Sequence, residues 1–237
     1  MEKDPKTEFD VQEEIQGILP AAIAVVTRPH EFYGSMRKSG GFLGPLFFMV
    51  VLGAVSGLLA ALLSLVGLAP ADAFVTGLAA VILMPVFIAI FGFIGAAILF
   101  VIWKAMGSAE SFETAYRGMA YTAAILPVTT VIDIIPYLGG IVGLVWMTWL
   151  LVIVSTTVHN IRAKTAWTVF GAVCVVFVLA TVSLEATARR MAAQMDGWDA
   201  DSRNRMEQLQ DMSPEEAGKA MGEFLKGLQQ SADEQQP

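Results

Sequence analysis

The sequence contains a single cysteine, Cys174, among its 237 residues. One cysteine permits no disulfide within the chain and excludes metal sites built from several thiolates. The two histidines, His30 and His159, offer no metal site either. Neither has a carboxylate at ligand spacing on its own predicted helix, because Glu31 follows His30 directly and points elsewhere. We therefore expect no metal ion and no cofactor.

Charged side chains are also scarce. Asp, Glu, Lys and Arg make up 16% of the chain, against ~25% in an ordinary soluble domain. Hydrophobic residues make up 55%. This composition predicts an integral membrane protein whose main partner is the lipid bilayer. Only six charged residues occur between positions 42 and 158, namely Asp72, Lys104, Glu110, Glu113, Arg117 and Asp133.

A basic surface is lacking as well, since the net charge is −7. Nucleic acid is therefore not an expected partner, because phosphate binding depends on Lys and Arg. The first 20 residues carry six Asp or Glu, which argues against a cleavable signal peptide and leaves targeting to the first spanning helix. The sequence shows no Walker-type phosphate loop, no Gly-x-Ser-x-Gly and no His-Glu-x-x-His, and no paired carboxylates lie in its apolar runs. We predict that the chain is not an enzyme.

Long apolar runs are what the sequence has in quantity. A spanning helix needs ~20 apolar residues. These runs are too long and too continuous for barrel strands. The predicted fold is an all-α polytopic bundle of five hydrophobic helices, over residues 43–68, 73–103, 119–135, 141–158 and 165–184.

The predicted bundle, residues 43–187, is flanked by two polar regions. Residues 1–42 form an N-terminal region with a helix from Val11 to Val26, broken at Pro20, and a second helix from Pro29 to Lys38. The second helix either lies in the membrane interface or packs on the bundle. Residues 188–237 have the composition of a soluble tail, in which a capping box at Ser213–Glu216 predicts a helix to Leu228.

The number of crossings is left open by the positive charges. With five crossings and a cytoplasmic N-terminus, nine Lys and Arg lie inside and the short outer loops have none, but six lie outside in the tail. If residues 119–135 form a re-entrant segment, four crossings bring the tail inside.

Several residues within the apolar runs are candidates for function or packing. Gly53 and Gly57 form a GxxxG pattern, which brings helices close either within the bundle, the favoured interpretation, or in a dimer. Asp133 is a carboxylate in an apolar run, and it either serves a buried site or lies at the interface in water. Three prolines, Pro85, Pro127 and Pro136, either shape the bundle or free backbone carbonyls for a transported ion.

The order of several short motifs resembles the Yip family, the Ypt/Rab-interacting membrane proteins, in its bacterial branch. The resemblance covers roughly residues 12–187. Its motifs are Pro29-His30-Glu31-Phe32-Tyr33 with Met36, Gly41-Phe42-Leu43-Gly44-Pro45-Leu46, Arg117-Gly118-Met119-Ala120-Tyr121 with Pro127, and Ile135-Pro136.

The resemblance implies a five-helix bundle with a cytoplasmic N-terminus and a role as a membrane scaffold or adaptor. It offers no catalytic residues. Eukaryotic members bind prenylated Rab GTPases and associate with one another. The short loops here look prokaryotic, so we expect the bacterial inner membrane, a homo-oligomer or another membrane protein as partner, and no Rab-type GTPase. The alternative is a transporter or channel for a small solute, lipid or ion that uses residues 119–136.

Overall fold

The computed structural model describes residues 11–68, 73–135 and 138–211, and five isolated positions beyond them. All elements in these ranges are helices, so the all-α prediction is confirmed for the described part of the chain. The chain divides into two units, residues 1–182 and 183–237. The first holds the helical bundle. The tail helix predicted from Pro214 to Leu228 lies largely outside the described residues.

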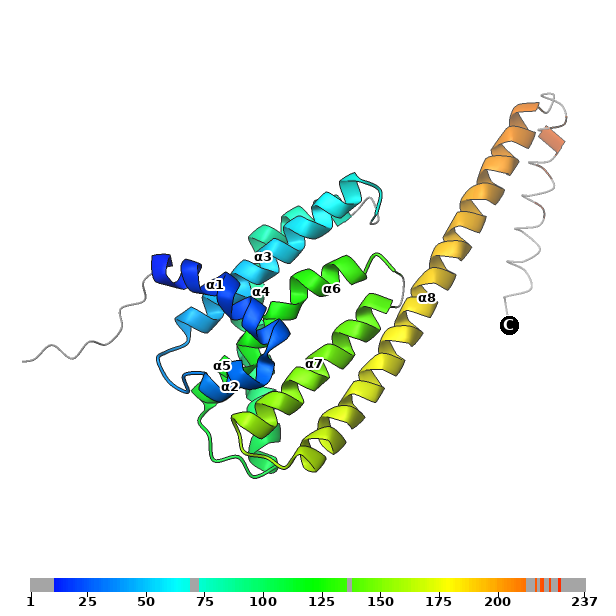
Figure 1. The fold of residues 1–237 in the computed structure, drawn as a ribbon. Helices are drawn as coiled ribbons and strands as arrows, with labels where there is room; N and C mark the ends of the chain where they lie inside the picture. The colour runs from blue at the N-terminus through cyan, green and yellow to red at the C-terminus, as the bar shows by residue number, and fades with distance from the viewer. Residues whose placement is uncertain are drawn as a thin grey trace, which may run out of the picture. The chain divides into compact units, whose positions relative to one another are not determined.

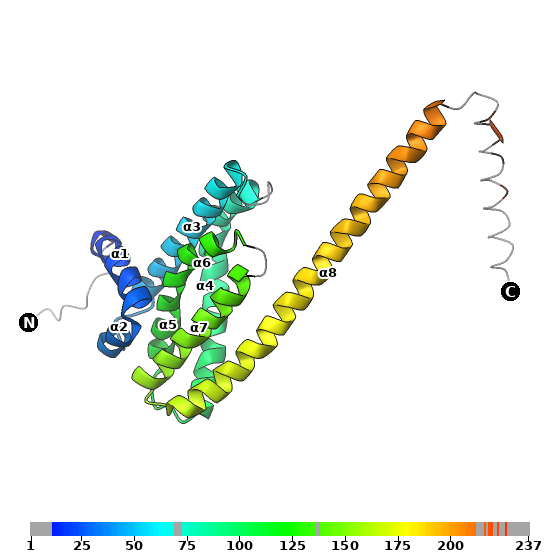
Figure 2. The ribbon, with the colours of Figure 1, turned by 45° about the vertical axis from the view of Figure 1, so that its right-hand side comes forward.

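Two N-terminal helices lie on the outside of the bundle. Helix α1 (Val11–Thr27) crosses α3 (Leu43–Leu65) and the third apolar segment (Figures 1 and 2). The short α2 (Pro29–Ser35) packs against α1 and α7 (Leu138–Thr157). The predicted break at Pro20 is wrong, because α1 continues through it. The Pro20 side chain is exposed, so its ring displaces no packed neighbour.

Three helices in the described part of the chain are long and apolar enough to cross a membrane. They are α3 (Leu43–Leu65), α7 (Leu138–Thr157) and the first part of α8 (Ala163–Asp211), from Ala163 to Met195. Helix α4 (Ala73–Ala105) follows the predicted second segment and passes through Pro85, whose side chain lies outside the description. Helix α8 continues beyond the apolar run at Leu184, because no proline follows until Pro214.

Helices α3 and α4 pack very closely. A Cβ built on Gly77 of α4 would lie 2.5 Å from the Gly57 carbonyl oxygen and 3.0 Å from the Ala61 Cβ. A Cβ on Gly53 would lie 3.0 Å from Ile88 Cδ1. The GxxxG pattern therefore lies against α4 within the bundle.

The third apolar segment is not one helix. It consists of the end of α5 (Phe112–Ala120), the 3₁₀ turn η1 (Tyr121–Ile125) and α6 (Leu126–Ile132). Pro127 explains the change, because its ring lacks an N–H donor and crowds the carbonyl four residues earlier. The backbone tightens into a 3₁₀ turn just before it.

This broken segment nevertheless runs from one end of the bundle to the other. The start of α5 and the end of α7 share one polar cluster, through Lys38 and the Ser108–His159 hydrogen bond. Helix α7 has 20 residues and is therefore roughly 30 Å long. Its first residue, Leu138, thus lies at the far end, and only residues 133–135 separate the end of α6 from the undescribed residues 136–137 (Figure 1).

Candidate functional site

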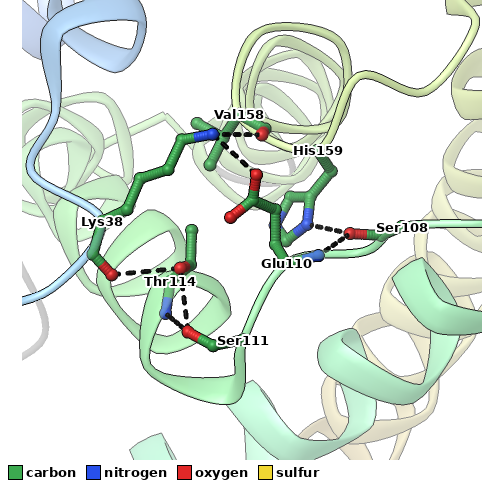
Figure 3. A network of polar contacts seen from close by, with 7 residues as sticks. All are labelled: Lys38, Ser108, Glu110, Ser111, Thr114, Val158 and His159. Carbon is green, nitrogen blue, oxygen red and sulfur yellow. Dashed lines mark hydrogen bonds and ion pairs between the residues drawn. The ribbon is translucent and has the colours of Figure 1, made fainter.

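Polar side chains gather at one end of the bundle, where the α2–α3 loop, α5 and the end of α7 meet. We call this cluster the polar hub, and its members are Lys38, Gly41, Ser108, Glu110, Ser111, Glu113, Thr114, Arg117 and His159. It is the densest set of long-range polar contacts in the described part of the chain, and Figure 3 shows six of its members together with Val158.

Arg117 is the central residue of the hub. The residue is 7% exposed, and its guanidinium donates from Nε to the Arg37 carbonyl and from a terminal nitrogen to the Gly41 carbonyl, both at 2.8 Å. A buried guanidinium must have its donors satisfied, and the fork of N–H groups reaches two carbonyls at once. Arg117 therefore fixes the α2–α3 loop against α5.

Other α5 residues hold the same loop. The Glu113 carboxylate accepts the Gly41 N–H at 2.7 Å, and the Thr114 hydroxyl donates to the Lys38 carbonyl at 3.0 Å. Gly40 and Gly41 have φ of +124° and +85°, conformations that favour glycine. Ser111 caps α5 by accepting the Thr114 N–H. Side chains at the start of α5 thus fix the backbone conformation of the α2–α3 loop.

Lys38 links this loop to the end of α7. Its ammonium group is 2.6 Å from the Glu110 carboxylate and 3.3 Å from the Val158 carbonyl, as Figure 3 shows. The Ser108 hydroxyl accepts the Glu110 N–H at 3.2 Å and shares a 2.7 Å hydrogen bond with Nδ1 of His159. Which of these two groups donates depends on the tautomer of the imidazole ring.

His159 sits between the hub and the apolar core. Its ring stacks on Trp103 with centroids 4.1 Å apart, and the Trp103 indole N–H donates to the Ser155 hydroxyl at 2.7 Å. His159 is 3% exposed, and its Nε2 has no hydrogen-bond partner among the described residues. Burial lowers the pKa of His159 to about 4, although the Glu110 carboxylate partly opposes this shift and Lys38 and Lys104 add to it.

We expect the protein to lose stability as the pH falls from about 6.5 towards 4. The pKa of His159 in the folded chain lies below the ~6.5 of the unfolded chain, so protonation favours unfolding, by at most about 3 kcal/mol. The contribution is complete above pH 6.5. Melting temperatures in detergent across this range should fall less for His159→Gln than for the parent. His30→Gln, at an exposed position, is the control. If the melting temperature of His159→Gln falls with pH as much as those of the control and the parent, His159 does not cause the effect.

Aromatic rings form the apolar floor below the hub. Tyr116 stacks on Phe93 at 4.5 Å and meets Phe42 edge-on at 5.3 Å. Burial raises the pKa of Tyr116 to about 12 and also raises that of Tyr33. Neither hydroxyl has a hydrogen-bond partner among the residues described. Both phenols are therefore neutral, and both tyrosines contribute the packing of their rings rather than a titrating hydroxyl.

The residues singled out in the sequence lie mostly away from the hub. Asp133 is exposed and ends α6, close to Gly139 at the opposite end of the bundle. Pro127 opens α6, and Pro136 lies outside the described residues. Tyr121 of η1 packs against the rings of Phe32 and Phe48, each at 5.0 Å.

Gly44 and Pro45 begin α3, where α1 approaches. Pro45 is buried, and a Cβ on Gly44 would lie 2.8 Å from the Glu14 carboxylate. This glycine therefore leaves room for Glu14 at the N-terminus of α3, a position that favours negative charge.

The sequence did not identify the hub as a site. Its spacing is irregular, and its long-range partners lie 51 to 120 residues apart. One signal was present, because Lys104, Glu110, Glu113 and Arg117 are four of the six charged residues in the apolar region, and all four lie in or beside the hub. Within the described residues, no group of three or more His, Cys, Asp or Glu could hold a metal ion.

A comparison with protein families gives one match. The model of the Yip1 domain matches residues 23–184, from the second half of α1 into α8, and so includes the hub and the bundle. No curated protein and no solved structure matches the chain.

Proposed function

Because this chain belongs to the Yip1 domain family, whose members are generally non-enzymatic membrane proteins, we propose that it is a scaffold or adaptor that organises proteins in the membrane. Its proposed partners are a second copy or another membrane protein. We place it in the bacterial inner membrane, because its loops are short, and we assign it no Rab-type GTPase. That it is an integral membrane protein follows from the family and from the three long apolar helices found among the described residues.

The hydroxyls of the apolar segments carry this proposal. Thr122, Thr129 and Thr130 donate to carbonyls three or four residues earlier in their own segment, at 2.6–3.0 Å. Ser155, Thr156 and Thr157 do the same in α7. A pathway for a polar solute needs donors and acceptors that face one another. Here these hydroxyls serve the backbone, which suits a packed scaffold.

The hub supports the same role. It fastens the α2–α3 loop, α5 and the α7–α8 connection into one end of the bundle through contacts within the chain. Exposed residues on these connections, Ser39 and Arg162, are thereby held in a fixed relation to each other. A surface held in advance in one conformation reduces the entropy lost on binding a partner.

Photo-crosslinking tests the scaffold proposal. A crosslinking amino acid is introduced at Ser39 or Arg162, with Leu62 on α3 as the control position. We expect one or two discrete protein adducts from the first two positions and none from Leu62. Arg117→Gln, which frees the loop, should weaken the adducts while the protein stays in the membrane. The proposal is wrong if the hub positions give no discrete adduct while the reconstituted protein moves a solute.

Transport by the broken segment is the second candidate. It is favoured by the 3₁₀ turn at Tyr121–Ile125, which interrupts a helix inside the bundle, and by the carboxylate of Asp133 at its end. The matching test is flux into vesicles, in which Asp133→Asn should abolish transport if this carboxylate serves it.

We further propose five crossings with a cytoplasmic N-terminus. The support is that α5, η1 and α6 together connect the hub end to the far end of α7, which a re-entrant segment would not do. In a Cys174→Ser background, cysteines at Ser39 and Arg162 should react with an impermeant maleimide only after the cells are permeabilised. Cysteines at Val66 and Ser231 should react in intact cells. Labelling of Ser231 only after permeabilisation, while Val66 reacts in intact cells, would exclude this topology.

A further inference from the structure

An apolar groove of about 450 Å³ lies between α1 and the elements that α1 crosses. Ile18, Ala22 and Val26 line it from α1, spaced by four residues along one helical face. Val51 and Val55 line it from α3. This volume falls within the ~300–1,000 Å³ of small-molecule sites.

The broken third segment supplies the remaining wall. Ala124 of η1 and Pro127 and Val128 of α6 face the groove. These residues lie where the backbone changes from a 3₁₀ turn to an α-helix. Pro127, which opens α6, is thus itself part of the groove wall.

The apolar side chains that line the groove favour a hydrocarbon ligand over a polar one. Thr27 is the one residue with a polar side chain among the lining residues, and its hydroxyl donates to the Ile23 carbonyl at 2.7 Å. A peptide or a polar solute would leave its own donors and acceptors unpaired against such walls, which costs free energy. A saturated chain brings no such cost.

The groove is continuous with the lipid-facing surface of a spanning helix. Val55, which lines it, is 45% exposed, and Leu58 and Leu62 continue the same face of α3 at 49% and 52% exposure. Val128 and Val131 continue it on α6, at 38% and 46% exposure. In a membrane these side chains contact acyl chains, so the groove opens directly onto lipid.

We propose that this groove holds one acyl chain of a bilayer phospholipid, with α1 packed against it. The chain fills an apolar space that would otherwise leave the facing side chains of α1, α3 and α6 without contacts. The position of α1 against the bundle thus includes a lipid as a structural component.

A phosphatidylcholine with a diazirine midway along one acyl chain tests the proposal. The full chain is reconstituted in phosphatidylcholine vesicles containing a trace of this probe, irradiated and digested. Peptide mass spectrometry should show adducts concentrated on residues 18–27 and 124–128, well above those at Leu58 and Leu62. Equal labelling at the groove and at Leu62 would overturn the proposal.

Groove-filling variants provide the second arm. Val55→Phe and Val128→Phe add volume at partly exposed positions that tolerate it without unfolding, and Leu62→Phe is the matched control outside the groove. Labelling of residues 18–27 should fall by roughly five-fold or more in the first two, the factor that about 1 kcal/mol of overpacking produces. It should not change in Leu62→Phe. Unchanged labelling in filled variants that melt like the parent would also overturn the proposal.

Discussion

Arg117→Leu is expected to lower the melting temperature of the detergent-solubilised protein by roughly 6–20 °C, which corresponds to a loss of about 3–5 kcal/mol. The substitution leaves the Arg37 and Gly41 carbonyls without their donor. The α2–α3 loop then loses its main attachment to α5. Tryptophan fluorescence during heating measures the effect.

Two further variants separate the geometry of Arg117 from its charge. Arg117→Lys keeps the charge but cannot reach both carbonyls with one compact ammonium group, so it should fall between the parent and Arg117→Leu. Arg162→Leu removes an exposed arginine at the same end of the bundle and should change the melting temperature little. If Arg117→Leu has the same melting temperature as Arg162→Leu, the hub does not stabilise the fold.

Gly77→Ala should destabilise the protein by about 1–3 kcal/mol, although alanine normally favours a helix. The added methyl would lie 2.5 Å from the Gly57 carbonyl oxygen, which belongs to the backbone of α3 and cannot rotate away. The two helices must therefore move apart along their contact. Thermal unfolding in detergent measures this loss.

Gly171→Ala is the matched control, because a Cβ at Gly171 of α8 meets no atom within 4 Å. Here we expect no loss, or a gain of about 0.5–1 kcal/mol from the better helix former. If Gly77→Ala and Gly171→Ala change the stability equally, α3 and α4 do not pack as closely at Gly77 as the structure shows.

The sequence located α3, α4 and α7 because a spanning helix needs a long continuous apolar run, whereas α8 continues to Asp211, well past the end of its apolar run at Leu184. The apolar run from Ala73 to Trp103 corresponds to α4, which ends only two residues later at Ala105. The third segment differs because a local rule, the missing donor of Pro127, competes with the apolar pattern. Hydropathy is the same for a helix and for a helix broken by a 3₁₀ turn, so only the proline signalled the change.

The hub could not be derived from periodicity. Arg117 pairs with carbonyls 76 and 80 residues earlier in the chain, and backbone carbonyls leave no mark on the sequence. His159 was considered only as a metal ligand, whereas its role depends on the stacking with Trp103. Gly77 was overlooked because its importance lies in the neighbouring helix, at Gly57, rather than in a pattern of its own.

The separations within the hub also order the biogenesis of the protein. Lys38 emerges from the ribosome 72 residues before Glu110 and 120 residues before Val158. During synthesis the first inserted helix pair therefore has an α2–α3 loop with donors and acceptors still facing water. The loop acquires its final partners only when α7 has been threaded into the bilayer. The hub thus forms late, after the helices have been inserted. A nascent chain stalled before Val158 would expose an α2–α3 loop without its hydrogen-bond partners to chaperones and membrane proteases.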